Sequence, residues 1–270
     1  MFWQEYLPQP ILFSFGPLII HWYGLILVLA ILVSAGLARR YFLKKGIISS
    51  SQFEDLVFYV IIFGLLGARF GHVVFFNLAY YLQNPLDVFK VWQGGLAIQG
   101  ALLFGFLTLL IWSYKKKINF WKLADGLALA VPLGQAIGRW GNYFNQELFG
   151  RPTSGWWGIP IAPFNRVAGY GAFSHFHPIF FYESFLSFIL FIILYRLAFK
   201  SSLKLGQITL FYFLGYGLIR FFVEFFRIDD TFMLGGVRIA QIIAWLLILA
   251  VYYVYKFHKN YKIISTDKTP

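Results

Sequence analysis

The stretch PLIIHWYGLILVLAILVSAGLARRYFLKK, residues 17–45, decides the fold. It places an apolar run, residues 17–38, directly before a cluster of four basic residues. A helix that crosses a bilayer needs about 20 mostly apolar residues. Basic clusters are typical of the cytoplasmic ends of such helices. We therefore predict that this segment spans a membrane.

Similar apolar runs follow along the whole chain. The predicted spans are 17–38, 55–76, 94–114, 122–140, 178–198, 206–226 and 236–256. The fourth is the most polar, because it contains Asp125, Pro132 and Gln135. The predicted fold class is all-α: one polytopic membrane domain, residues 1–270, with seven transmembrane helices.

The composition points the same way. The chain is 59% hydrophobic, 22% aromatic and 13% charged, whereas soluble domains carry about 25% charged residues. It contains no cysteine, so disulfides and thiolate metal sites are excluded. The net charge of +12 would suit nucleic acid, but the basic residues form short clusters between apolar runs. That pattern indicates a membrane lipid partner and no nucleic acid.

The basic clusters also predict the orientation. They follow the first, third, fifth and seventh spans, so all lie on one side, which we assign to the cytoplasm. Their members are Arg39, Arg40, Lys44, Lys45, Lys115, Lys116, Lys117, Lys122, Arg196, Lys200, Lys204, Lys256, Lys259, Lys262 and Lys268. The N-terminus is then outside and the C-terminus inside. Residues 150–177, rich in Gly, Pro and aromatics, are expected to form a small extracytoplasmic head.

The remaining basic residues are of a different kind. Seven of the eight are arginine: Arg69, Lys90, Arg139, Arg151, Arg166, Arg220, Arg227 and Arg238. Arginine grips phosphate with a planar fork and stays charged at any pH. An alternative is that single arginines snorkel to the lipid interface.

The most informative segment is GRWGNYFNQELFG, residues 138–150. It packs polar groups at the outer end of an apolar span. A charge at mid-bilayer costs about 2.5–3.5 kcal/mol, so a charge within a span is usually paired or functional. The candidates are Arg139, Asn142, Asn145, Glu147 and Gly150. The alternative is an ordinary helix end with an Arg–Glu pair.

A second segment, IRFFVEFFRIDD at residues 219–230, carries a charged stripe. Arg220, Glu224 and Arg227 are spaced by four and three residues, so they share one helix face. Such a stripe should face a protein interior or a wet cavity, although a structural ion pair would look the same. Both segments fall on the same predicted side, which favours one shared anion site.

Four shorter motifs lie near the predicted outer ends of their spans. Tyr23 lies in HWYG, Arg69 in GARFGH, Gln99 in QGGLAIQG and Glu183 in HPIFFYES. An aromatic pair at the interface is commonly only a belt, and the small residues of GARFGH suit helix packing. His175 and His177 lack metal-ligand spacing, so no metal is expected.

The motifs together resemble the prolipoprotein diacylglyceryl transferases. GRWGNYFNQELFG is similar to that family's signature, and PILFSFGPLIIHWYG, GARFGHVVF, WQGGLAIQG, HPIFFYES and RFFVEFFRIDD follow in family order. The resemblance implies that the thiol of a lipobox cysteine, in the signal peptide of a preprolipoprotein, attacks phosphatidylglycerol. It also implies a site at the outer leaflet of the bacterial plasma (inner) membrane, with no metal or other cofactor.

The resemblance implies roles for individual residues. Arg139 and Arg220 would hold the phosphate, and Asn142 would bind headgroup oxygens. Glu147 and Glu224 would orient the arginines. The remaining candidates are Tyr23, which matches a required Tyr, Gly150, which matches a required Gly, and Asn145, Arg69 and Arg227 as further substrate contacts.

The base is left open by one departure from the family. Well-known members carry a His where this chain has Gln99, which cannot accept a proton at neutral pH. Tyr23, Glu224, the lipid phosphate and hydroxide are the alternatives. We favour positioning and phosphate charge as the main source of rate, since a thiol is already a few per cent thiolate near pH 7.

Other functions fit the residues less well. A transporter of an anionic substrate would also need buried Arg–Glu sets, but it typically shows inverted repeats and midplane sites. An intramembrane protease would need paired catalytic groups within the spans, and no such pair is evident. A family paralogue with altered activity remains a third possibility.

Overall fold

The structure is a computed structural model that describes residues 2–16, 18–200, 203–229 and 233–265. Outside the described part lie Lys268, Asp230 (the last residue of the segment 219–230) and the side chains of Lys200, Lys259 and Lys262. The described chain groups into two compact units, residues 37–126 and residues 1–36 with 127–270. Each unit is described by itself, and the single domain stays a prediction.

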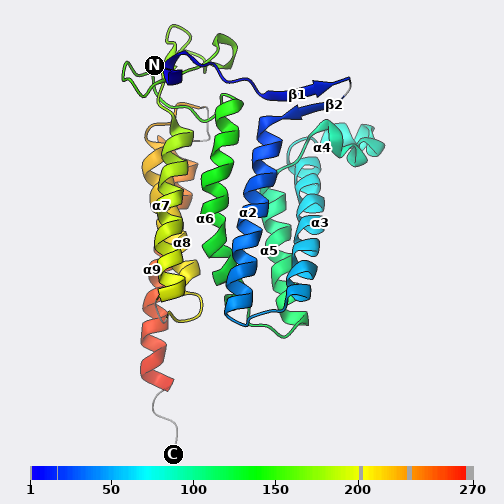
Figure 1. Ribbon diagram of the computed structural model, residues 1–270, viewed down its shortest axis with the longest axis vertical. Coiled ribbons are helices and arrows are strands. Elements are labelled where there is room, and N and C mark those ends of the chain that lie inside the picture. The colour runs from blue at the N-terminus through cyan, green and yellow to red at the C-terminus, as the bar shows by residue number, and fades with distance from the viewer. Residues whose placement is uncertain (1, 17, 201–202, 230–232, 266–270) are drawn as a thin grey trace, which may run out of the picture. The chain divides into compact units, whose positions relative to one another are not determined.

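Seven long helices are found at the seven predicted spans among the described residues (Figure 1). Their bounds are α2 Trp22–Lys44, α3 Ser50–Phe75, α5 Ile98–Lys115, α6 Phe120–Phe144, α7 Ile179–Lys200, α8 Gln207–Glu224 and α9 Ile239–Ser265. By length and composition, α2, α3, α5 and α7 are apolar enough to cross a membrane. The protein is therefore helical, with several membrane-compatible helices.

The predicted start of the first span is wrong. Residues Leu18–His21 form strand β2, which pairs antiparallel with β1, Ile11–Phe15, and the helix begins only at Trp22. Gly16, in the left-handed region at φ +57°, makes the connecting turn possible. Two more two-stranded hairpins occur in the described chain, β3–β4 (Ile159–Pro160, His175–Phe176) and β5–β6 (Met233–Leu234, Val237–Arg238).

In the unit of residues 37–126, α3 packs closely against α5. A Cβ on Gly100 would overlap the backbone of Gly67, so only glycine permits this approach. The small residues of GARFGH therefore serve helix packing, as predicted. The short helices α4 (Leu78–Gln83), η1 (Pro85–Phe89) and η2 (Val91–Gln93) follow the C-terminal end of α3. At the opposite end, an ion pair of 3.5 Å joins Asp55 to Lys116.

In the other unit, α8 packs against both α7 and α9 (Figure 1). The chain between α6 and α7 folds as a small head over a core that includes Phe149, Ile159 and Phe176. The side-chain amide of Gln146 connects separate segments of the head. It donates to the carbonyl of Pro8 (2.8 Å) and accepts from the backbone N–H of Ala162 (2.7 Å). Residues within 150–177 thus contribute to a compact head, and its extracytoplasmic location stays a prediction.

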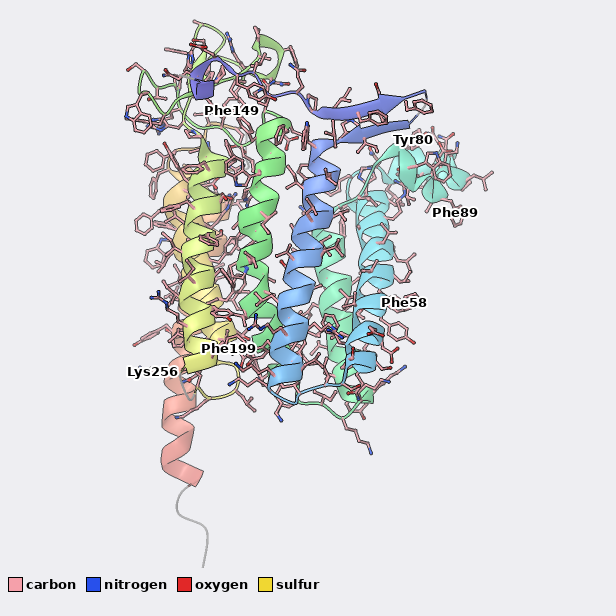
Figure 2. All side chains as sticks on the ribbon, in the orientation of Figure 1. Phe58, Tyr80, Phe89, Phe149, Phe199 and Lys256 are labelled. Atoms are coloured by element: carbon pink, nitrogen blue, oxygen red, sulfur yellow. The ribbon has the colours of Figure 1, made fainter. Side chains whose placement is uncertain are left out.

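Large apolar side chains cover the outer faces of the helices (Figure 2). Phe58 on α3, for example, is 61% exposed and projects away from the ribbon. Water disfavours such a surface, whereas lipid chains accommodate it. The exposed faces fit a lipid environment.

Candidate active site: an arginine–carboxylate cluster

Two of the predicted arginines meet at one carboxylate. The Glu183 side chain, on α7 and 2% exposed, forms ion pairs with Nε of Arg139 on α6 and, at 2.8 Å, with Nη1 of Arg220 on α8. The Arg220 contact is also a hydrogen bond, whereas the Arg139 contact lacks hydrogen-bond geometry, so Oε2 of Glu183 is left without a donor among the described residues. Glu183 thus links three helices through two guanidinium groups.

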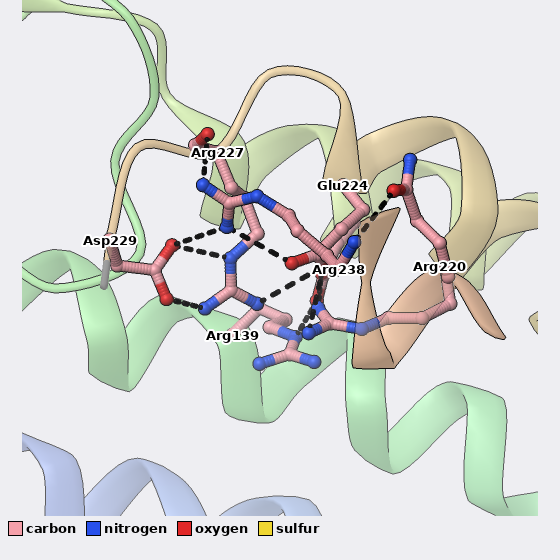
Figure 3. A network of polar contacts seen from close by, with 8 residues as sticks. Arg139, Arg220, Glu224, Arg227, Asp229 and Arg238 are labelled. Atoms are coloured by element: carbon pink, nitrogen blue, oxygen red, sulfur yellow. Dashed lines mark hydrogen bonds and ion pairs between the residues drawn. The ribbon is translucent and has the colours of Figure 1, made fainter. Parts of the chain in front are cut away.

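A second buried carboxylate extends the cluster (Figure 3). Glu224, the last residue of α8, pairs with Nη2 of Arg220 at 3.0 Å and with Nη1 of Arg238 at 3.2 Å. Its distance to Nη1 of Arg227 is 3.8 Å. The predicted i, i+4 pair on α8 is present, but Arg227 lies beyond the end of this helix.

Arg227 finds its main partner in the following loop. Its Nε and Nη2 donate to the two oxygens of Asp229 at 2.8 and 2.5 Å, in a bidentate arrangement. Burial by itself would raise the pKa of Asp229, but the hydrogen bonds and charge of Arg227 outweigh it and lower that pKa. Nη2 of Arg238 completes the connection by donating to the carbonyl of Arg227 at 2.8 Å.

The cluster carries an excess of positive charge. Its members are four arginines (Arg139, Arg220, Arg227, Arg238) and three carboxylates (Glu183, Glu224, Asp229), which gives a formal charge of +1. Arg139 and Arg220 keep 22% and 21% of their side-chain surface exposed. The two Nη groups of Arg139 donate to no acceptor in the described part of the chain. The cluster can therefore accept one further anion.

Two hollows lie in the same unit as the cluster, and the first of them is lined by cluster residues. A cavity of about 420 Å³ is lined by Glu224, Arg227 and Arg238. A groove of about 370 Å³ is lined by apolar side chains of α2, α6 and α7, among them Ile26 and Trp140, which neighbours Arg139 in the chain. Ser184 lines this groove too, but its hydroxyl donates to the carbonyl of Ala136, which leaves the groove apolar.

The acidic residue of the signature has partners other than those expected. Glu147 is exposed and accepts from Asn142 (3.2 Å) and Asn145 (2.9 Å). Among the described residues it pairs with no arginine, so the expectation that it orients them is wrong. The reason is local: the backbone reverses after α6, with Gln146 and Leu148 both at φ +54°, and this turn folds Glu147 back onto the two amides.

Gly150 is required by close packing. The backbone forms an antiparallel bridge with Arg227, and the N–H of Gly150 donates to the carbonyl of His177 at 2.8 Å. A Cβ would lie 2.6 Å from the Phe226 carbonyl oxygen. Gly150 therefore ties the signature turn to the chain after α8, and its role is one of position.

Tyr23 lies at the start of α2 against α6. Its ring is so close to Gly141 that a Cβ there would lie 2.8 Å from it. The hydroxyl makes no hydrogen bond with the described residues, and the side chain is 38% exposed. Tyr23 thus lies against Gly141, which is two residues after Arg139 on α6.

Two predicted residues, Arg69 and Gln99, belong to the unit of residues 37–126. Arg69 is 7% exposed and donates four hydrogen bonds, to the carbonyls of Asp87, Val88, Gly94 and Gly95. These bonds hold the guanidinium group of Arg69 against the backbone that follows α4, which favours a structural role. Gln99, in the first turn of α5, is exposed.

The site contains residues that the sequence analysis did not assign. Glu183 was named only as part of the motif HPIFFYES, and Arg238 only among the eight basic residues outside the predicted cytoplasmic clusters. A carboxylate within a span needs a cationic partner, so the signal for Glu183 was present. The partner of Arg238 could not be deduced, because the contact joins residues 14 apart across a turn.

The fold and the cluster define a class: a helical membrane protein with an arginine-rich cluster of formal charge +1. The prolipoprotein diacylglyceryl transferase family matches residues 10–256. The chain belongs to this family of transferases. It is 38% identical to a Synechocystis protein, over 96% of this chain and 94% of that one. It is 39% identical to a Bacillus licheniformis protein, over 89% of each chain. Both relatives are named phosphatidylglycerol--prolipoprotein diacylglyceryl transferase.

Proposed function

We propose that the chain transfers the diacylglyceryl group of phosphatidylglycerol to the lipobox cysteine thiol of preprolipoproteins. One observation carries the proposal: Arg139 and Arg220, from separate helices, converge on Glu183 in a cluster of charge +1. A phosphodiester is a monoanion, so one headgroup would neutralise the cluster.

The free donors of Arg139 suit the phosphate. Its two Nη groups are available because Glu183 engages only Nε. Two parallel N–H groups of a guanidinium match two oxygens of a phosphate. When the phosphoester bond breaks, negative charge grows on the phosphate, so the arginines bind the transition state more tightly than the ground state.

The reaction balances without another reactant. The thiolate sulfur forms a bond to the terminal glycerol carbon of the diacylglyceryl group, and the bond from that carbon to the phosphate oxygen breaks. Glycerol phosphate leaves with the electron pair, and the thiol proton passes to the leaving phosphate or to water. The product is a thioether.

The lipid chains need an apolar path beside the cluster. The groove lined by Ile26, Trp140 and Phe181 supplies one, because it runs along α6 and α7, the helices that carry Arg139 and Glu183. An acyl chain lying there would hold the headgroup at the arginines. Burial of a CH₂ group contributes about 0.8 kcal/mol, so this groove would supply much of the binding energy.

We infer a seven-span topology with the N-terminus outside. The cluster lies at the α8–α9 end of its unit, and Lys204 lies at the opposite, α7–α8 end. The positive-inside rule then directs the cluster to the outer leaflet of the bacterial plasma membrane. Fusion of a periplasmic-only reporter enzyme to each terminus tests this: activity at the C-terminus would overturn it.

The activity is tested with purified protein, phosphatidylglycerol and a lipobox peptide. Mass spectrometry should detect diacylglyceryl-cysteine with the wild type, and none with Arg139→Ala or with a Cys→Ser peptide. Arg40→Ala, an exposed arginine at the lysine-rich end of α2, is the matched control and should retain activity. Full activity of Arg139→Ala would refute the proposed phosphate site.

A further inference from the structure

A second groove lies entirely within residues 37–126 and shares no residue with the arginine cluster. It has a volume of about 570 Å³ and runs between α3 and α5. Tyr59 and Phe63 form one wall, and Leu107 and Ile111 form the other. All four side chains are more than a third exposed, so the groove is open to the surroundings of the helices.

The length of the groove matches one leaflet of a bilayer. Its lining on α5 extends from Phe104 to Lys115, which corresponds to about 16 Å at the rise of a helix. The hydrocarbon core of a bilayer is about 30 Å thick. The groove is therefore about as deep as one lipid acyl chain is long.

The two ends of the groove differ in chemistry. The end near Phe104 is apolar, and Thr108 adds no free donor, since its hydroxyl donates to the carbonyl of Phe104 at 2.7 Å. The other end carries Lys115 and Lys116, and Asp55, at 3.5 Å from Lys116, is the one carboxylate among the described residues that line the groove. One positive charge is thus in excess where a lipid headgroup would lie.

A buried donor lies at this charged end. Trp112 lines the groove and is 5% exposed. Its Nε1–H has no hydrogen-bond acceptor among the described residues. A buried indole N–H usually has a partner, and the ester or phosphate oxygens of a phospholipid are acceptors of the right kind.

From these features we propose that the groove binds one anionic glycerophospholipid. An acyl chain lies between α3 and α5, and the phosphate lies at Lys115 and Lys116. This site goes beyond the proposed transfer reaction, because its lipid is bound at the lysine-rich end of the helices and is not the donor at Arg139.

The test uses the fluorescence of Trp112 in vesicles. The emission of Trp112 is obtained by subtracting the fluorescence spectrum of the Trp112→Phe variant from that of the full-length protein. Two vesicle preparations of the same composition are compared: in one only the phosphatidylglycerol carries brominated chains, and in the other only the phosphatidylcholine does. Brominated phosphatidylglycerol should quench the emission of Trp112 more than brominated phosphatidylcholine does. Equal quenching by the two lipids would mean only bulk lipid at the groove and would overturn the proposal.

Charge variants locate the headgroup. One lysine near the surface favours anionic lipid by a factor of roughly five, and Asp55 offsets part of the charge of Lys116. Lys115→Gln/Lys116→Gln changes the local charge from +1 to −1 and should therefore lower the preference roughly 25-fold. Lys44→Gln/Lys45→Gln, a lysine pair at the end of α2, should keep it. An unchanged preference in the first pair would refute the assigned headgroup position.

Two further measurements separate this site from its alternatives. Ile111→Trp should fill the groove and abolish the preference, whereas Leu102→Trp, on exposed surface of α5 outside the groove, should not. Soluble glycerol phosphate should not compete, and competition would show a phosphate site without lipid selectivity, against the proposal. Arg139→Ala should keep the quenching preference while losing transfer, so failure of the proposed reaction is distinguishable from failure of this site.

Discussion

The substitution Glu183→Gln tests the centre of the cluster most directly. Glutamine has the shape of glutamate but no charge, so Arg139 and Arg220 both lose the carboxylate that joins them. Removing one partner of a buried ion pair costs about 3–5 kcal/mol. Because both arginines are about a fifth exposed and can be partly hydrated, we expect the lower end of this range.

The effect on catalysis should separate from the effect on binding. Loss of Glu183 raises the charge of the cluster from +1 to +2, so the anionic donor should bind at least as well and KM should not rise. The guanidinium groups of Arg139 and Arg220 would no longer be held in their relative positions, and a displacement of about 1 Å can cost a factor of about 10² in rate. We therefore expect kcat to fall about 10²-fold at unchanged or lower KM.

The assay is the appearance of diacylglyceryl peptide at varied phosphatidylglycerol, together with thermal unfolding in detergent. Glu54→Gln is the matched control, because Glu54 is an exposed carboxylate that, among the described residues, accepts only from the hydroxyl of Ser50 at 3.1 Å. It should change neither quantity. A Glu183→Gln enzyme with wild-type kcat, or one whose only defect is a raised KM, would show that this carboxylate does not position the arginines.

Three other outcomes are expected. Gly150→Ala should destabilise the protein by about 1–3 kcal/mol in thermal unfolding, because its Cβ would lie 2.6 Å from the carbonyl oxygen of Phe226, whereas Gly138→Ala, which meets nothing within 4 Å, should not. Asp229 has a lowered pKa in the folded protein. The stabilisation that its carboxylate contributes is therefore complete above the unfolded pKa of about 3.9 and is lost as the pH falls through the lower folded pKa. Hydrogen exchange of residues 225–229 should rise in that acid range, and Asp229→Asn should show the higher exchange already at neutral pH. Gln99→His should raise the neutral-pH rate by less than the factor of about 10²–10⁴ typical of a dedicated base, and a larger gain in a pH–rate profile would contradict the view that positioning supplies most of the rate.

The sequence by itself determined the positions of the helices. Apolar runs of sufficient length predicted the seven long helices of the described chain, because an unbroken apolar segment has few other stable states in lipid. It missed the start of α2, where Leu18–His21 pairs as a strand. Pairing with a preceding segment is not written into the periodicity of a four-residue apolar stretch.

The sequence also indicated which residues are costly to bury. Arg139, Arg220 and Glu224 were predicted because charges within apolar runs require partners. Only the tertiary structure decided which side chains those partners are. Glu183 joins Arg139 to Arg220 across three helices, whereas Glu147 turns back to Asn142 and Asn145. Spacing along a chain fixes which side chains share a helix face, but packing between helices decides which charges meet, because an ion pair depends on distances of a few ångströms between distant segments.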